Sequence, residues 1–174
     1  AKIDPETGEL LLKGPSVMKG YYNRPTLTSE VITPDGWLHT GDIASIDKDG
    51  HIHITGRIKN MIVLSGGKKV FPEEVESVLC ENFSEVCVFG SSRTSGSKEG
   101  TEDIVAVIVP TEHFISLAKD EEELNRMVRE EAKHYSSRLA SYKRPVNIVV
   151  VKDPLPKTTT RKIKRNEVKE LINV

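Results

Sequence analysis

The sequence predicts an α+β fold in which a short mixed sheet packs against helices, behind a strand-rich first third. Three observations predict it. Short apolar runs and turn residues alternate over the first third of the chain. Two dense β-branched runs follow, Val86 to Phe89 and Ile104 to Val109, and apolar residues then recur at helical spacing from Leu124 to Tyr142. With 174 residues, the chain has room for one ordinary domain or two small ones.

The first third contains two short apolar segments before its clearest signal. Glu9 to Lys13 is predicted to be a strand closed by Gly14-Pro15. Trp37-Leu38-His39 is expected to lead into a turn at Thr40-Gly41-Asp42. Both segments are short enough to be strands of one small sheet.

A β-hairpin is predicted next. Its turn is Asp47-Lys48-Asp49-Gly50, because Asp-Gly is a strong hairpin signal between the flanking runs Ile43 to Ile46 and His51 to Thr55. The isoleucines of the second run alternate with His51 and His53, so a strand places both imidazoles on one face. Two imidazoles could hold a metal ion, but no third ligand is apparent nearby. We interpret them as a solvated strand face and assign no metal site.

A second turn lies further along the chain. Two apolar-leaning arms, Met61 to Leu64 and Lys68 to Phe71, surround Ser65-Gly66-Gly67. Glycine adopts positive φ readily and lets another molecule approach the backbone. Pro72 then opens a helix with three glutamates near its start, whose apolar positions continue at helical spacing to Phe83.

The remaining elements follow from caps and periodicity. Asp120 is expected to cap a long helix, with Glu123 placed to reach back toward the cap. Ser91 to Asp103, rich in Ser, Gly and charge, is predicted to be a mobile loop. Val146 to Val151 predicts another strand, and the apolar spacing around Val168 predicts a closing helix. The stripe of the long helix is interpreted as core packing: Leu124, Met127, Val128, Tyr135, Leu139 and Tyr142.

Composition and charge exclude some classes of protein. The formal charge is −1 and the pI is about 6.6, so the overall balance does not indicate nucleic acid or an anionic membrane as partner. No apolar run approaches the roughly 18 residues that span a bilayer, and a soluble, cytoplasmic protein is expected. Cys80 and Cys87 are expected to be buried thiols. The chain begins with Ala-Lys, and we interpret it as part of a longer protein.

The pattern of predicted elements changes near Ile58-Lys59, from short strands and turns to a combination of helices and strands. Residues 1–58 are predicted to be a β-rich remnant with too few apolar positions for a complete domain. Residues 59–174 are predicted to be a compact unit of helices and sheet, large enough to fold alone. Lys59 marks the junction.

Three motifs carry the functional signal. Leu155 to Arg165 is a Pro-led, Thr-rich loop with several cations, in which a lysine can move its three-donor ammonium onto a carboxylate or phosphate oxygen. Asp42 follows a Thr-Gly turn and can accept hydrogen bonds from paired hydroxyls such as those of a ribose. Gly56-Arg57-Ile58-Lys59 lies between them. In this order the motifs resemble the C-terminal portion of the adenylate-forming superfamily, and most of all a long-chain fatty acyl-CoA synthetase.

The resemblance implies a two-step ligase. In this family a large N-terminal domain binds ATP, Mg²⁺ and a carboxylic acid, and a small C-terminal lid rotates between adenylate formation and acyl transfer to coenzyme A. Residues 1–58 resemble the end of the large domain, and residues 59–174 resemble the whole lid. The family's phosphate loop and Mg²⁺ site have no match here, so the chain is expected to be inactive alone and to need the N-terminal domain.

The resemblance also assigns roles by position. Asp42 matches the aspartate that holds the ATP ribose, Arg57 the basic residue that supports it, and Lys59 the hinge. Lys162 matches the catalytic lysine of adenylation. The Gly66-Gly67 turn is placed against the pantetheine arm of coenzyme A.

Three further cations bear on this match. Arg161 stands where the family usually has glycine, so the loop must form without glycine's freedom. Lys164 is the competitor for the catalytic role, although the residues that follow fit Lys162 better. Lys68 is expected to contact a nucleotide phosphate.

Other interpretations stay open. The acid could be an amino acid of a peptide synthetase adenylation domain, or the protein could be a fatty-acyl-AMP ligase. A non-catalytic phosphate-binding or nucleic-acid-binding module is the remote alternative, because Lys152 to Lys169 holds seven Lys and Arg against two acids. That segment lacks the aromatic residues of a base-stacking surface.

Overall fold

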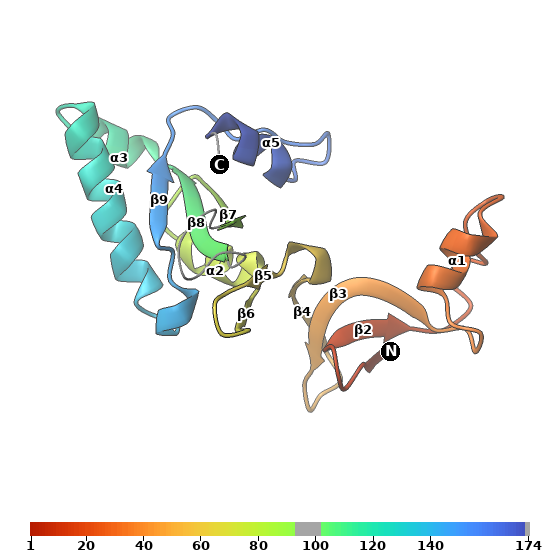
Figure 1. Ribbon diagram of the computed structural model, residues 1–174. Helices are drawn as coiled ribbons and strands as arrows, with labels where there is room; N and C mark the ends of the chain where they lie inside the picture. Colours follow the sequence, from red (N-terminus) through yellow and green to blue (C-terminus); the bar gives the residue numbers. More distant parts are fainter. Residues whose placement is uncertain (93–101, 173–174) are drawn as a thin grey trace. The chain divides into compact units, whose positions relative to one another are not determined.

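The computed structural model describes residues 1–92 and 102–172. It divides into two compact units, Ala1–Asn60 and Met61–Val174, and each is described by itself. Helices and small sheets are combined in the way the sequence predicts, so the α+β class is confirmed (Figure 1). None of the helices in the described part of the chain is long and apolar enough to cross a membrane.

The first unit is built on an antiparallel sheet with strand order β1-β2-β3-β4. The elements are β1 (Lys2–Ile3), β2 (Glu9–Leu12), β3 (Leu38–Ile46), β4 (Ile52–Arg57) and the 3₁₀ helix η1 (Ile58–Asn60). The predicted hairpin is confirmed, because Ile46 pairs with Ile52 across the Asp-Gly turn.

One turn expected in this unit is not a separate turn. Thr40, Gly41 and Asp42 lie inside the long strand β3. The strand absorbs the irregularity because Gly41 has φ +72°, and the register against β4 shifts between Ile43 and Ala44. A glycine in the left-handed region therefore bends a continuous strand here.

Helix α1 (Pro25–Val31) was not predicted from the sequence. It has seven residues and buries none of them, so it lacks the apolar stripe that reveals a helix in a sequence. Its one local signal is proline in the first turn.

The sheet of the second unit is mixed, as predicted. Strand β7 (Glu85–Ser92) pairs antiparallel with β8 (Glu102–Val109), and β8 pairs parallel with β9 (Asn147–Val150). A small hairpin of β5 (Ile62–Val63) and β6 (Lys69–Val70) precedes it. The loop predicted between residues 91 and 103 falls largely outside the described residues, and its ends belong to β7 and β8.

Helices cover both faces of this sheet (Figure 1). They are α2 (Pro72–Leu79), α3 (Glu112–Leu117), α4 (Glu121–Ser136) and α5 (Arg165–Leu171), with the 3₁₀ helix η2 (Ser141–Lys143) after α4. The α2 and α4 side chains share one apolar cluster with Val86, Val88 and Ile104, whereas Val168 of α5 packs with Cys87. Alternate residues of the strands thus face opposite helical layers.

The local helix signals were also correct. Pro72 is the first residue of α2, and Asp120 caps α4 by accepting a 2.8 Å hydrogen bond from the Glu123 N–H. Glu123 reaches back and accepts from the Lys119 N–H at 3.0 Å. Together these bonds satisfy backbone donors at the start of α4.

Two burial predictions were wrong. Cys80 is exposed because it follows the last turn of α2, whereas Cys87 is buried as expected, and burial raises the pKa of its thiol to about 12. Tyr142 is 38% exposed because α4 ends at Ser136, which breaks the helical register before η2.

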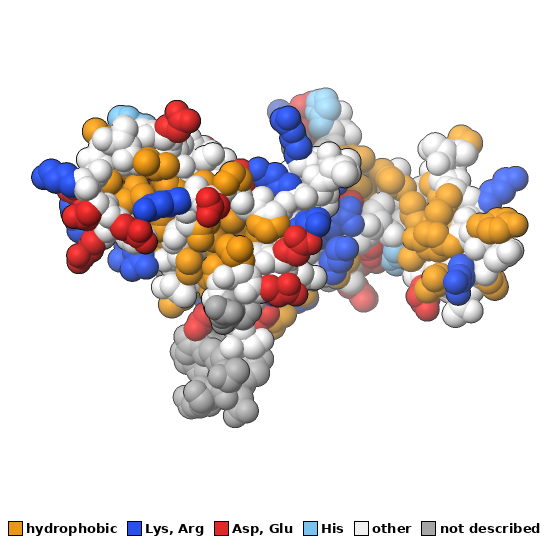
Figure 2. All heavy atoms as spheres, turned by 90° about the horizontal axis from the view of Figure 1, so that it is seen from above, with side chains coloured by type: hydrophobic (Ala, Val, Ile, Leu, Met, Phe, Trp, Pro, Cys, Tyr) orange, Lys and Arg blue, Asp and Glu red, His pale blue; other side chains and the backbone are white. Residues whose placement is uncertain are grey.

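Hydrophobic side chains gather on the drawn face of each unit, with charges of both signs among them (Figure 2).

Candidate functional site

Asp42 and Arg57 form an ion pair in the first unit. They are directly opposite each other in the β3–β4 ladder, and Arg57 Nε lies 2.8 Å from Asp42 Oδ1. The Asp42 side chain is 18% exposed. Within the described residues its Oδ2 accepts no hydrogen bond, so that oxygen can accept one from a hydroxyl ligand. The structure therefore brings two predicted site residues together.

A buried glutamate holds the strand segment that carries Asp42. Glu9 is only 7% exposed, and its Oε1 accepts a 2.8 Å hydrogen bond from the Gly41 N–H. Its Oε2 lies 2.8 Å from His39 Nδ1. On the same segment the Thr40 hydroxyl donates to the Leu10 carbonyl at 2.7 Å. The irregular backbone at Gly41 is thus held by side-chain hydrogen bonds from β2 and β3.

Glu9 was not among the residues predicted from the sequence. The available signal was a glutamate directly before three leucines, a place where a strand buries its residues. A buried carboxylate needs hydrogen-bond partners, so such a residue marks a structured polar site.

Lys162 lies in the second unit, on a small hairpin loop between β9 and α5. Lys157 and Ile163 form an isolated antiparallel bridge at its base. The Thr158 N–H donates to the Lys162 carbonyl at 2.8 Å, and the Lys162 N–H donates to Thr158 Oγ1 at 3.1 Å. The Thr-rich sequence therefore closes the loop with its own hydroxyl and backbone groups.

Glu85 of β7 anchors the first arm of this loop. Its Oε2 accepts a 2.9 Å hydrogen bond from the Leu155 N–H, and its Oε1 is paired with the Lys157 ammonium. Leu155 is itself buried in the apolar cluster beneath α5. The start of the loop is therefore fixed by one carboxylate and one apolar contact.

Glu76 of α2 anchors the second arm. Its Oε1 lies 2.6 Å from Arg165 Nη2 and accepts a 2.7 Å hydrogen bond from the Val88 N–H, while Arg165 Nε donates to the Val88 carbonyl at 2.8 Å. Burial raises the pKa of Glu76, and Arg165 opposes this shift. The pair also occupies backbone groups at the edge strand of the sheet, which would otherwise be unpaired.

The Lys162 side chain is exposed, and its ammonium makes no hydrogen bond or ion pair with the residues that the structure describes. Lys164, the competitor for the catalytic role, forms an ion pair with Glu167 at 2.7 Å. The loop therefore has a fixed base and presents the Lys162 cation to solvent.

Arg161 adopts a conformation that favours glycine. Its φ is +62°, and Asn23 is the other non-glycine residue with positive φ in the described chain. The left-handed conformation costs an L-residue about 1–2 kcal/mol. Arg161, at the position where the resemblance implies glycine, thus bends the backbone through positive φ.

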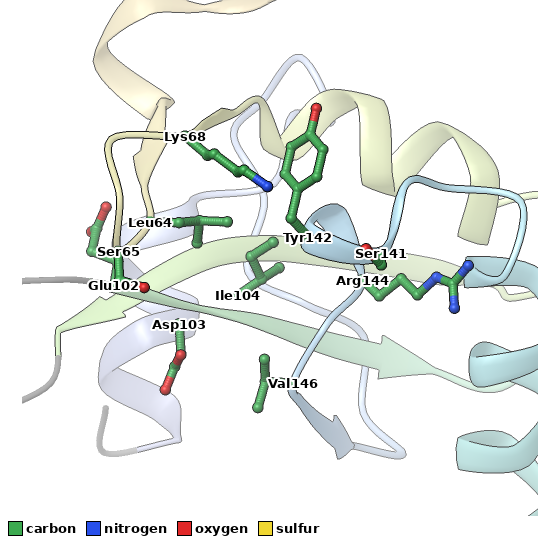
Figure 3. A pocket seen from close by; sticks show the side chains of 10 residues that line it. All are labelled: Leu64, Ser65, Lys68, Glu102, Asp103, Ile104, Ser141, Tyr142, Arg144 and Val146. Atoms are coloured by element: carbon green, nitrogen blue, oxygen red, sulfur yellow. The ribbon is translucent and has the colours of Figure 1, made fainter. Parts of the chain in front are cut away.

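Ser65 and Lys68, the residues on either side of Gly66-Gly67, line a pocket of about 300 Å³ in the second unit (Figure 3). The two glycines have φ +85° and +75°, and a Cβ on either one would meet no heavy atom within 4 Å among the described residues. Backbone conformation, rather than crowding, therefore requires glycine at both positions.

Among the described residues that line the pocket, Lys68 has the cation that is placed to meet a ligand. The Lys68 ammonium lies 4.5 Å from the centre of the Tyr142 ring. Arg144 also lines the pocket, but its guanidinium points away from Lys68 and donates to the Leu139 and Ser137 carbonyls (Figure 3). Glu102 and Asp103 add negative charge on the strand β8 side.

The predicted hinge residue lies at the end of the first unit. Lys59 is an exposed residue of η1, the last element of the first unit.

His51 and His53 both lie within hydrogen-bond distance of Asp47, at 3.3 and 2.8 Å. The hairpin turn folds the Asp47 carboxylate back toward β4, so a carboxylate that the sequence did not indicate lies beside the two imidazoles.

Comparison with known proteins identifies the family. Residues 74–162, slightly more than half of the chain, match the AMP-binding enzyme C-terminal domain. A feruloyl-CoA synthase of an Amycolatopsis species is 38% identical over 166 residues, which are 94% of this chain and 30% of that protein. A medium/long-chain fatty-acid–CoA ligase of Mycobacterium tuberculosis is 40% identical over 155 residues, which are 88% of this chain and 25% of that protein.

A solved structure agrees with these matches. The o-succinylbenzoate coenzyme A synthetase of Bacillus subtilis, in complex with ATP and magnesium, superposes with a TM-score of 0.69 at 31% identity. The match covers 92% of this chain and 30% of that one. The chain thus spans less than a third of the length of these three proteins. It belongs to the AMP-binding enzyme C-terminal domain family.

Proposed function

We propose that the chain is the C-terminal part of an AMP-forming acyl-CoA synthetase, in which residues 59–174 act as the lid and residues 1–58 end the large domain. One observation carries this proposal most directly. The Lys162 ammonium is exposed and without a partner in the described residues, on a loop whose two arms are held by Glu85 and Glu76.

The chemistry of adenylation explains this arrangement. A carboxylate oxygen attacks the α-phosphorus of ATP, the bond to pyrophosphate breaks, and an acyl-adenylate forms. Two anions must meet, so catalysis rests on positioning and charge neutralisation. We assign neutralisation to the Lys162 ammonium and ribose binding to the free oxygen of Asp42, with Arg57 fixing the carboxylate. Mg²⁺ would be held by residues outside this chain.

The second half-reaction transfers the acyl group to the coenzyme A thiol. The Gly66-Gly67 turn and the neighbouring pocket support a place for the pantetheine arm, because no side chain projects from the glycines. Of the described residues that line this pocket, Lys68 has the ammonium that we assign to a nucleotide phosphate. These roles rest on position and on chemistry, and they define separate tests for the two half-reactions.

A fatty acid is the proposed substrate class. A lysine at the hinge, here Lys59, is typical of the long-chain fatty acyl members of the family. The similar Mycobacterium tuberculosis protein, which is named a medium/long-chain fatty-acid–CoA ligase, also supports a fatty acid. The feruloyl and succinylbenzoate enzymes, which match about as well, make aromatic acids the competing class.

Acid-dependent AMP release by the parent protein tests the proposal. A panel of fatty, aryl and amino acids would be assayed with and without coenzyme A. AMP release that needs both a fatty acid and coenzyme A is expected. AMP release driven by amino acids would contradict the proposed substrate. Acyl-adenylate that accumulates in the presence of coenzyme A, without release of AMP, would contradict the proposed acceptor.

A further inference from the structure

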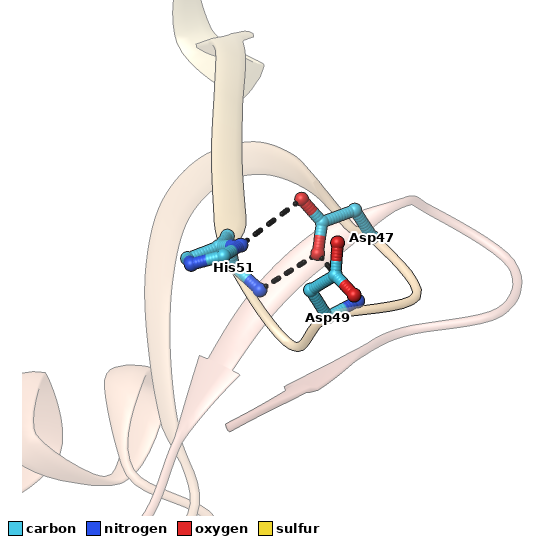
Figure 4. Close-up of side chains that lie close together, drawn as sticks. All are labelled: Asp47, Asp49 and His51. Atoms are coloured by element: carbon cyan, nitrogen blue, oxygen red, sulfur yellow. Dashed lines mark hydrogen bonds and ion pairs between the residues drawn. The ribbon is translucent and has the colours of Figure 1, made fainter.

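A cluster of ionisable side chains lies at the closed end of the β3–β4 hairpin. Asp47 Oδ2 is 2.8 Å from His53 Nε2 and 3.3 Å from His51 Nδ1. Asp47, Asp49 and His51 also have ligand atoms that all lie within 4.8 Å of one another, and Figure 4 shows these three side chains gathered around the turn. The Asp42–Arg57 pair is at the other end of the same hairpin, so this cluster is separate from the proposed nucleotide site.

The turn itself orients the Asp47 carboxylate. Its Oδ1 accepts hydrogen bonds from the Asp49 and His51 N–H groups, both at 2.9 Å. This leaves Oδ2 directed at the two imidazoles. Asp47 Oδ2 thus faces His53 at 2.8 Å while Oδ1 is held by the backbone of the turn.

The contacts of Asp47 Oδ2 with each of the two imidazoles are compatible with a shared metal ion. A tetrahedral Zn²⁺ with ligand bonds of about 2.0–2.2 Å keeps neighbouring ligand atoms about 3.3 Å apart. The two separations around Asp47 Oδ2, 2.8 and 3.3 Å, lie within about 0.5 Å of that value. The His51 and His53 side chains are 74% and 59% exposed, so small rotations can adjust them.

We propose that Asp47, His51 and His53 bind one divalent ion of the class that prefers imidazole ligands, represented by Zn²⁺. Asp49 lies beside the same site and can supply a further carboxylate oxygen. Two imidazole nitrogens favour Zn²⁺, Ni²⁺ or Cu²⁺ over Ca²⁺ and Mg²⁺, which take oxygen ligands. The ion replaces the N–H···O contacts between the imidazoles and Asp47, and it joins the turn to the first residues of β4.

Calorimetric titration of the chain with Zn²⁺ tests the proposal. Cys80→Ser is used as the background, because Cys80 is exposed and its thiol could bind zinc itself. One ion per chain is expected. His53→Gln should raise the Kd about tenfold or more, since it removes one ligand. His113→Gln removes an exposed imidazole of the second unit and should leave the Kd unchanged.

A second variant separates metal binding from turn stability. Asp47→Asn keeps an oxygen that can accept the two backbone N–H groups, but it removes the charge, so it should retain the hairpin and weaken Zn²⁺ binding. Circular dichroism checks that each variant is folded. The proposal is overturned if the chain shows no saturable Zn²⁺ binding, if His53→Gln binds as tightly as its background, or if Ca²⁺ binds more tightly than Zn²⁺.

Discussion

The two segments that carry the proposed catalytic groups are held in opposite ways. Around Asp42, a buried carboxylate and a strand ladder fix the backbone, and Arg57 fixes the side chain. Around Lys162, Glu85 and Glu76 fix only the base of the loop, and the tip is exposed. A group that must hold a bound ribose gains from a fixed acceptor. A cation that must contact two reacting anions benefits from an exposed side chain that can move, provided that the base of its loop is anchored.

The same difference appears in the backbone. Gly41 and Arg161 both adopt positive φ, +72° and +62°. Glycine does so at little cost, whereas arginine is strained by about 1–2 kcal/mol. The first segment is therefore relaxed, and the second depends on its anchors to maintain a strained turn.

Loss of the anchor at Arg165 is expected to have the largest effect on stability. Arg165→Met leaves the half-buried Glu76 carboxylate without its cation, which should lower the free energy of unfolding of the second unit by about 3 kcal/mol. Hydrogen exchange at the Val88 amide measures this directly, because that N–H donates to Glu76.

The pH dependence sharpens this prediction. Burial already raises the pKa of Glu76 in the folded state, and removal of Arg165 raises it further. The folded variant then binds a proton more readily than the unfolded chain, so its stability deficit should shrink as the pH falls through that raised pKa. Lys152→Met, which breaks an exposed pair with Glu121, is the control and should cost well under about 1 kcal/mol. Equal effects of the two substitutions would show that the loop is not anchored at Arg165.

Glu9→Ala tests the fixed segment and should have an intermediate effect. It leaves the Gly41 N–H without its acceptor in a part-buried place, at a cost of about 1–3 kcal/mol. Trp37 is the single tryptophan and belongs to the first unit, so its fluorescence during urea unfolding reports this loss. Glu9→Gln keeps an acceptor oxygen and should lose less. If both variants unfold at the same urea concentration as the parent, Glu9 does not hold this segment.

Arg161→Gly should have the smallest effect. Glycine relieves the left-handed strain but adds freedom to the unfolded chain, so the two terms nearly cancel and the change should stay within about 1 kcal/mol. Gly41→Ala, which introduces strain without such relief, should destabilise the first unit and serves as the opposite case. Strong destabilisation by Arg161→Gly would mean that the arginine side chain, rather than the backbone, maintains the loop.

Much of the fold followed from local signals in the sequence. Local physical chemistry explains why three patterns form the structures that they predict: the Asp-Gly hairpin, the Asp120 cap and the β-branched runs. The structure confirms all three. Helix α1 could not be predicted in this way, because it buries no side chain and so has no apolar stripe in the sequence. Cys80 and Tyr142 were misplaced because periodicity does not show where a helix ends.

The candidate site was less accessible to prediction. Motif order indicated Asp42 and Lys162, but it gave no sign that Glu9, Glu76 and Glu85 support them. The contacts of these glutamates with Gly41, Arg165 and Leu155 join residues about 30 to 90 positions apart, and only the folded chain brings such residues together. The roles of the predicted site residues stay predictions until activity is measured.

The most direct measurement is ATP–pyrophosphate exchange by the parent protein carrying Lys162→Ala, compared with Lys164→Ala. Loss of a positioned donor costs about 10²- to 10³-fold in rate, so exchange should fall by that factor in Lys162→Ala and change little in Lys164→Ala. Thioester formation from supplied acyl-adenylate should be spared in both variants. Unchanged exchange in Lys162→Ala would remove this lysine from the mechanism.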